Sequence, residues 1–167
     1  MRVTKAYLGL GTNLGDRENI LREARAEIQA AFPGARFSPI YETEPVGKVD
    51  QPWFLNQVAE IKTDETPVGL LKWCLDLERR KGRVRVVPQG PRTLDVDVLL
   101  FGDLEVQTDS LCVPHPRLLE RRFVLLPLSD LAPEILIPGA GRTVCEALKK
   151  VEGNAQVRPF EGRSMTC

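Results

Sequence analysis

The sequence predicts an α+β fold in which helices pack on an antiparallel β-sheet. Four segments alternate apolar and polar residues with the period of two that is typical of strands, and two longer segments place apolar residues at helical spacing. These segments follow the order strand, helix, strand, strand, helix, strand. This is the order of the split βαβ unit of ferredoxin-like sheets, so we expect a βαββαβ core followed by C-terminal additions.

The first half of the core begins with a strand over Val3–Leu10, which leads into a glycine-rich turn. The apolar stripe that follows predicts a helix over Asp16–Phe32, and a Pro-Gly pair ends it. A second strand is expected over Arg36–Glu42. The prolines and glycine of Thr43–Gln51 then indicate a loop.

The second half of the core begins with a strand over Phe54–Ile61. Thr66 and Pro67 predict the start of a helix, because a hydroxyl residue caps free N–H groups and proline fits the first turn. Gly82 ends this helix, the loop Arg83–Pro91 follows, and the last core strand comes directly after it.

The rest of the chain contains a short hairpin, the proline-rich turn Val113–Pro116, and helical stretches near Arg117–Leu128 and Val144–Val151. The tail, residues 152–167, is polar and expected to be loosely held, with a short strand over Gln156–Phe160. No linker composition interrupts the chain, so residues 1–167 are expected to form a single domain.

The composition excludes several classes of function. The 23 basic and 23 acidic residues balance among 167, so no general nucleic-acid-binding surface is expected. Four cysteines without CxxC spacing predict neither a zinc site nor a disulfide framework, and they fit a reducing cytoplasm. No apolar run approaches about 18 residues, so no membrane span is expected. We expect a cytoplasmic monomer.

Two aspartates on the last core strand form the strongest candidate site. Side chains alternate along a strand, so Asp95 and Asp97 share a face, with their Cα atoms ~7 Å apart. Two like charges on an apolar strand persist most easily when cations neutralise them. Carboxylate oxygens suit Mg²⁺, which usually binds one or two carboxylates together with substrate phosphates. The alternative is a pair of acidic residues on a solvated sheet face.

Basic residues near this strand favour a phosphate ligand. Arg83 and Arg85 would point the same way in an extended loop, and Arg92 precedes the aspartates. Guanidinium groups bind phosphate oxygens in a bidentate manner and keep their charge. His115, the single histidine, lies between two prolines and is a further candidate contact. The alternatives are a solvated basic loop and an ordinary turn histidine.

The glycine-rich run Gly9–Gly15 imitates a dinucleotide-binding fingerprint. Its spacing is GxGxxxG rather than GxGxxG, and alternating parallel βαβ units are missing, so we interpret it as tight turn geometry beside a ligand cavity.

Phe54 and Asn56 share a strand face, where an aromatic ring and an amide could together hold a flat heterocycle. Phe54 and Phe123 could equally be ordinary core residues.

Taken together, these residues closely resemble the 6-hydroxymethyl-7,8-dihydropterin pyrophosphokinase family of folate biosynthesis. The block GPRTLDVDVLLFG is its most specific signature in this chain. The matching segments cover nearly the whole chain in the family's order and are Tyr7–Gly15, Tyr41–Gly47, Asp50–Asn56, Glu78, Gly82–Arg85, Gly90–Asp97 and Val113–Pro116.

The resemblance implies transfer of pyrophosphate from ATP to the hydroxymethyl group of the pterin, with release of AMP. It implies that Asp95 and Asp97 hold two Mg²⁺ ions, and that these aspartates act with Arg83 and Arg92 in catalysis. The implied nucleotide-binding positions are Glu78, Arg83, Arg85, Arg92, Val98, Leu111, Cys112, His115 and Arg121. The implied pterin-binding positions are Gly9, Thr43, Pro45, Val46, Phe54, Asn56, Asp95 and Phe123.

The chain departs from the family pattern at four positions. Pro88 and Gln89 replace a basic and an aromatic residue, Phe54 replaces a tyrosine found in some members, and Glu44 stands beside the family's Thr-Pro-Pro turn. Two other function classes stay open at this point, a dinucleotide-binding oxidoreductase and a non-catalytic ferredoxin-like binding module.

Overall fold

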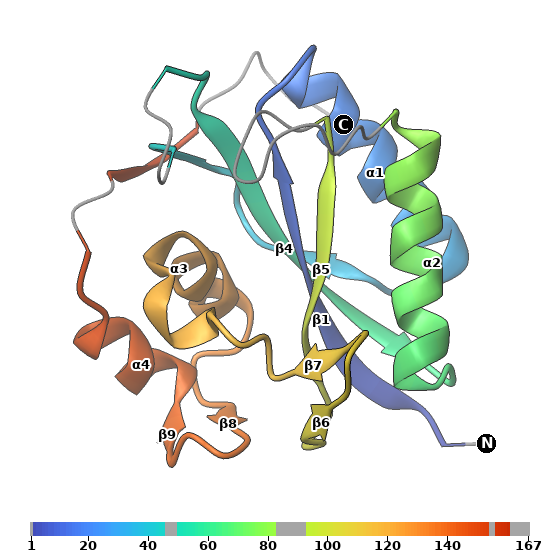
Figure 1. The fold of residues 1–167 in the computed structure, drawn as a ribbon, viewed down its shortest axis with the longest axis vertical. Coiled ribbons are helices and arrows are strands. Elements are labelled where there is room, and N and C mark those ends of the chain that lie inside the picture. The colour runs from blue at the N-terminus through green and yellow to red at the C-terminus, as the bar shows by residue number, and fades with distance from the viewer. Residues whose placement is uncertain (1, 46–49, 83–92, 154–155, 161–167) are drawn as a thin grey trace.

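The computed structural model describes residues 2–45, 50–82, 93–153 and 156–160. Figure 1 shows the chain as a sheet with helices on both sides. The core elements, in order, are β1 (Thr4–Thr12), α1 (Arg17–Ala31), β2 (Arg36–Phe37), β3 (Tyr41–Thr43), β4 (Phe54–Thr63), α2 (Pro67–Arg80) and β5 (Asp95–Phe101). The additions are β6 (Val106–Gln107), β7 (Cys112–Val113), the 3₁₀ turn η1 (Leu118–Glu120), α3 (Arg122–Leu131), β8 (Leu136–Ile137), β9 (Arg142–Thr143), α4 (Val144–Lys150) and β10 (Val157–Pro159).

The main sheet confirms the predicted α+β class. Its strands run in the order β10-β3-β4-β1-β5, with β2 also paired to β4, and every described pairing is antiparallel. The short strand expected near the C-terminus is β10, which pairs with β3. Within the described residues, no helix has the length and apolar character needed to span a membrane.

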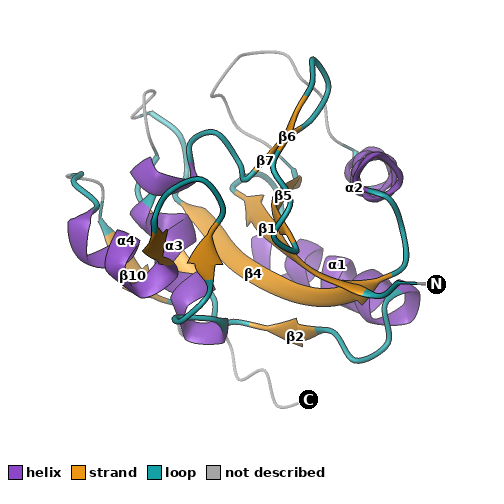
Figure 2. Ribbon diagram, turned by 90° about the horizontal axis from the view of Figure 1, so that it is seen from below, coloured by secondary structure: helices purple, strands orange, loops and turns teal. Residues whose placement is uncertain are grey.

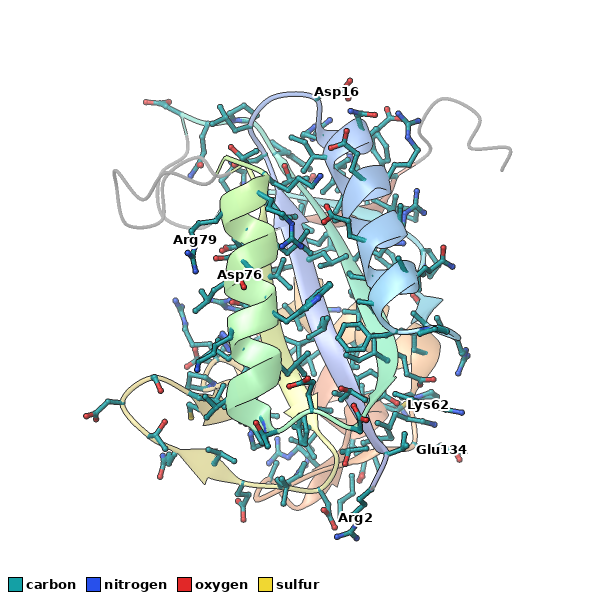
Figure 3. All side chains as sticks on the ribbon, turned by 90° about the vertical axis from the view of Figure 1, so that its right-hand side faces the viewer. Arg2, Asp16, Lys62, Asp76, Arg79 and Glu134 are labelled. Atoms are coloured by element: carbon teal, nitrogen blue, oxygen red, sulfur yellow. The ribbon has the colours of Figure 1, made fainter. Side chains whose placement is uncertain are left out.

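The two faces of the sheet carry separate hydrophobic cores. Helices α1 and α2 lie side by side on one face, where Leu8, Leu55 and Val96 point toward them. Figure 3 looks onto these helices, with Asp76 and Arg79 on the outer surface of α2. Helices α3 and α4 cover part of the other face, against residues such as Tyr7 and Val58. The part of this second face that the helices leave uncovered carries the candidate site.

Local sequence signals account for both core helices. The carboxylate of Asp16 accepts a hydrogen bond from the N–H of Asn19 and caps α1. The hydroxyl oxygen of Thr66 likewise accepts a hydrogen bond from the N–H of Gly69 and caps α2, whose first residue is Pro67. Both caps satisfy N–H groups that have no partner within the helix.

The prediction of one strand over Arg36–Glu42 was wrong, because the segment breaks into β2 and β3. At the break, Pro39 has no N–H to donate to a ladder. Side chains replace the missing ladder bonds: the Ser38 hydroxyl accepts from the N–H of Val58, and the Gln57 amide donates to the Ser38 carbonyl. The stretch near Arg117–Leu128 is also divided, since Arg121 has an extended backbone between η1 and α3.

Candidate functional site

The sheet register places both aspartates opposite glycines of β1. Gly11 lies between Asn56 of β4 and Asp95 of β5, and Gly9 lies between Val58 and Asp97. A glycine has no side chain, so the sheet surface is hollow between β4 and β5. A Cβ atom added at Gly11 would stand 3.1 Å from the Asn56 Nδ2 atom, so this position leaves little room for a larger residue.

A cavity of about 170 Å³, the central cavity, occupies this hollow. Six of the eight positions implied for pterin binding line it, namely Gly9, Thr43, Phe54, Asn56, Asp95 and Phe123. Pro45 is described but is not part of its wall, and Val46 lies outside the described residues.

The amide of Asn56 has a defined orientation in the central cavity. The Thr43 hydroxyl donates a hydrogen bond to its Oδ1 atom, which leaves the Nδ2 donor near Gly11 and the cavity. Both side chains are buried. Phe54 lines the wall from β4 and Phe123 from α3, and the Arg121 guanidinium lies 5.6 Å from the Phe123 ring centroid. The cavity therefore combines flat apolar surfaces with a fixed hydrogen-bond donor, which suits a planar heterocycle.

A second, larger cavity of about 730 Å³, the edge cavity, lies beyond the outer edge of β5. Its walls come from α2, β5 and the segment between β6 and β7, which lie near one another in Figure 2. Five of the positions implied for nucleotide binding line it, namely Glu78, Val98, Leu111, Cys112 and His115. The implied positions Arg83, Arg85 and Arg92, and the departures Pro88 and Gln89, lie outside the described residues.

Arg121 is among the positions that the resemblance implies for nucleotide binding. It lines the central cavity and not the edge cavity. Sequence analysis also did not assign Glu44, Arg117 and Glu120 to the central cavity, or Leu71, Leu75, Arg79 and Thr108 to the edge cavity. The run of charged residues directly after the Pro-His-Pro turn was the available signal for Arg117 and Glu120.

Asp97 lines both cavities, so it marks the place where two bound reactants would meet. Its Oδ2 atom lies 4.0 Å from the Nε2 atom of His115, and its side chain is 40% exposed. Asp95 lies two residues before it on the same strand face.

Glu78 fixes the strand between these two aspartates. Its buried carboxylate accepts a hydrogen bond of 2.8 Å from the N–H of Val96, the residue between them. Strand β5 is the last strand of the sheet on this side and has no neighbouring strand beyond it, and the Glu78 carboxylate is the acceptor for the Val96 N–H. Glu78 thus belongs to the wall of the edge cavity and also ties α2 to the aspartate strand.

The two aspartates fit a magnesium site that substrate phosphates complete. No group of three or more His, Cys, Asp or Glu side chains in the described residues could hold a metal ion by itself. Mg²⁺ usually needs only one or two carboxylates when phosphates supply further oxygens. Asp95 lines the central cavity and Asp97 lines both cavities, so phosphates bound in the edge cavity could complete the coordination of a metal held by these carboxylates.

His115 is a neutral hydrogen-bond donor at this junction. Burial, together with the positive charges of Arg121 and Arg117, lowers its pKa to about 4, and the charge of Asp95 partly opposes this shift. Its Nδ1 atom accepts a hydrogen bond from the N–H of Arg117. The proton of the neutral ring is therefore on Nε2, the atom nearest Asp97.

This pKa predicts how stability depends on pH. The unfolded chain protonates His115 near pH 6.5, whereas the folded chain does so near pH 4. Between these values the unfolded state binds more protons, so the free energy of unfolding falls as the pH falls; above about 6.5 the effect vanishes. Urea denaturation in EDTA, from about pH 7 to about pH 4.5, should show a smaller loss of stability for His115→Gln than for the wild type. Parallel curves for the two proteins would contradict the assignment.

Comparison with known proteins identifies the family. The sequence profile of 7,8-dihydro-6-hydroxymethylpterin-pyrophosphokinase (HPPK) matches residues 7–133. This chain belongs to the HPPK family. It is similar to the 2-amino-4-hydroxy-6-hydroxymethyldihydropteridine pyrophosphokinase of Methylorubrum extorquens, with 46% identity over 90% of this chain and 95% of the relative. The enzyme of the same name from Bacillus subtilis is 48% identical over 78% of this chain and 79% of the relative.

A solved structure shows the same fold. The Plasmodium falciparum HPPK-DHPS triple mutant superposes on 89% of this chain with a TM-score of 0.71 and 19% identity. The chain spans 42% of the length of that protein.

Membership of the HPPK family gives the reaction class predicted from the sequence. The chain is a pyrophosphokinase of folate biosynthesis that transfers pyrophosphate from ATP to hydroxymethyldihydropterin. The antiparallel pairing of β1 with both neighbours also argues against a dinucleotide-binding oxidoreductase, whose fingerprint needs a parallel βαβ unit.

Proposed function

We propose that the central cavity binds the pterin, the edge cavity binds ATP, and the reaction takes place beside Asp97. The observation that carries this assignment is that Asp97 lines both cavities. The central cavity has the aromatic walls and the amide donor that a pterin ring requires. The edge cavity is larger, and apolar residues such as Val98 and Leu111 offer surface for a nucleotide base.

Asp95 and Asp97 would hold two Mg²⁺ ions together with the ATP phosphates. Bound Mg²⁺ would offset the negative charge of the phosphates and polarise the oxygens bonded to it. The donor set fits this ion, as both ligands are carboxylates on one strand face. Arg83, Arg85 and Arg92 are expected to contact the phosphates, because guanidinium groups stabilise the charge of a transferred phosphoryl group.

The chain's own residues would orient the two reactants. Phe54 and Asn56 position the pterin so that its hydroxymethyl group reaches the aspartates, and His115 donates a hydrogen bond from Nε2 toward the phosphates. The hydroxymethyl oxygen then forms a bond to the β-phosphorus of ATP. The bond from that phosphorus to the oxygen of AMP breaks, AMP leaves, and the carboxylate of Asp97 accepts the hydroxyl proton. Such positioning supplies much of the catalysis in phosphoryl transfer.

An AMP-release assay tests this proposal. Equal amounts of AMP and pterin pyrophosphate are expected when ATP, 6-hydroxymethyl-7,8-dihydropterin and Mg²⁺ are all present. Omitting the pterin or adding EDTA should abolish AMP formation. A non-catalytic binding module would form no AMP under any of these conditions, and its ATP affinity would not depend on Mg²⁺. We further expect the chain to be a monomer, which sedimentation of the purified chain would test.

A further inference from the structure

The C-terminal strand β10 lies beyond residues 7–133, the part of the chain that the family profile matches, yet it pairs with β3, which contributes a residue to the wall of the central cavity. Val157 pairs with Thr43, a residue of the cavity wall. Just before β10, Gln156 and Glu44 exchange two hydrogen bonds of 3.0 Å: the N–H of Glu44 donates to the Gln156 carbonyl, and the N–H of Gln156 donates to Glu44 Oε2. Glu44 also lines the cavity. The C-terminal segment is thus bonded to two adjacent residues of the wall.

Arg158 of β10 makes the side-chain contacts of this segment. Its Nε and Nη2 atoms lie 3.0 Å and 2.7 Å from Glu42 Oε1, and its guanidinium lies 4.4 Å from the centroid of the Trp53 ring. Charge-assisted hydrogen bonds and a cation–π contact are among the stronger interactions available to an exposed arginine. Arg158 therefore joins Glu42, the middle residue of β3, to Trp53, the residue directly before β4.

A second arginine completes this cluster. Arg17 of α1 donates hydrogen bonds to Glu42 Oε2 at 2.9 Å and to the Trp53 carbonyl at 2.8 Å. Burial would raise the pKa of Glu42, but the hydrogen bonds from Arg158 and Arg17 outweigh it and lower the pKa. Glu42 is therefore a carboxylate at neutral pH, held by both arginines.

The cluster lies behind the cavity wall. Side chains alternate along a strand, so Glu42 points away from the face that carries Thr43. Trp53 directly precedes Phe54, whose Cα partner across the β3–β4 ladder is Thr43. Movement of Trp53 or Glu42 would consequently displace two neighbouring residues of the wall.

We propose that Arg158 is a positioning residue for the pterin: it holds Trp53 and Glu42, and through them keeps Phe54 and Thr43 in place. This inference rests on the assignment of the central cavity to the pterin. The walls of the edge cavity come from α2, β5 and the β6–β7 segment, and the cluster contributes no residue to them. Loss of Arg158 should accordingly weaken pterin binding and leave ATP binding unchanged.

Steady-state kinetics of four variants test the proposal. Arg158→Ala is expected to raise the KM for 6-hydroxymethyl-7,8-dihydropterin about fivefold, which corresponds to roughly 1 kcal/mol of lost pterin binding, without changing the KM for ATP. Arg158→Lys keeps the charge but not the planar guanidinium, and should give an intermediate KM. The control Arg142→Ala removes an arginine of β9 and should match the wild type. Phe54→Ala tests the cavity assignment itself.

The kinetic results distinguish the positioning role of Arg158 from the assignment of the central cavity to the pterin. If Phe54→Ala raises the pterin KM but Arg158→Ala does not, the positioning role is refuted and the cavity assignment stands. If neither variant raises it, the cavity assignment fails as well. An equal rise of both KM values in Arg158→Ala would show general destabilisation and would also refute the role.

The environment of Trp53 gives an independent measurement. The chain has two tryptophans, Trp53 and Trp73, so a Trp73→Phe background leaves Trp53 as the single reporter. In that background, Arg158→Ala should increase acrylamide quenching of the Trp53 fluorescence. Unchanged quenching would mean that Arg158 does not hold the ring, and would overturn the proposal.

Discussion

Replacement of Asp97 by asparagine is expected to lower kcat by about a thousandfold, a loss typical of removing one group that stabilises transition-state charge. Asparagine has nearly the same size, so the packing of β5 should survive. The substitution removes one negative charge at the residue that lines both cavities. It therefore removes a Mg²⁺ ligand and the acceptor for the hydroxyl proton in one step. AMP release measured at saturating and at limiting Mg²⁺ should show the loss under both conditions.

A matched substitution controls for charge alone. Asp103 lies in the exposed turn that follows β5, and Asp103→Asn should retain wild-type kcat and Mg²⁺ dependence. Wild-type-like activity of Asp97→Asn at limiting Mg²⁺ would show that the carboxylate is not needed for the metal or for the proton. The proposed reaction site would then be wrong.

Replacement of Asn56 by aspartate is expected to weaken pterin binding about a hundredfold, from the loss of roughly 2–3 kcal/mol of hydrogen bonding in a buried site. The Thr43 hydroxyl can still donate to the new carboxylate, so the side chain keeps its orientation. The variant nevertheless replaces the Nδ2 donor of Asn56 with a carboxylate oxygen, which can only accept a hydrogen bond from the ligand. Asp95 stands in the same row of the sheet, on the far side of Gly11, so the variant also adds a like charge nearby.

Isothermal titration calorimetry with a non-hydrolysable ATP analogue would measure the pterin affinity of this variant. The affinity for the analogue itself should be unchanged. Asn19→Asp, an equivalent substitution in the first turn of α1, lines neither cavity and serves as the control. Equal losses of pterin and nucleotide affinity would argue against a specific contact between Asn56 and the pterin.

Much of the fold could be predicted because its signals are local. The caps at Asp16 and Thr66 and the alternation along β1, β4 and β5 depend only on neighbouring residues. The break between β2 and β3 has one local signal, Pro39, which the prediction of a single strand did not use. The bonds that bridge the break could not be predicted locally, because Gln57 and Val58 bond to Ser38 from another strand. The alternation of apolar and polar residues in Arg36–Glu42 gives no information about those partners.

The candidate site shows the same division between local and distant signals. The spacing of Asp95 and Asp97 is a property of one strand and needs no tertiary information. That Asp97 faces Gly9, and that it borders two cavities, follows from the register of β1 with β5. The resemblance implies a nucleotide contact for Arg121, but its place beside Phe123 in the central cavity depends on where η1 ends and α3 begins, which residue spacing alone does not show.

The position of β5 at the edge of the sheet has a consequence for solubility. An apolar edge strand with free backbone donors can pair with a strand of another molecule and so begin aggregation. In this chain the Val96 N–H already bonds to Glu78, and Asp95 and Asp97 place two negative charges on the same strand. Carboxylates at an edge discourage intermolecular pairing. Residues proposed to hold the metal would thus also protect β5 from self-association.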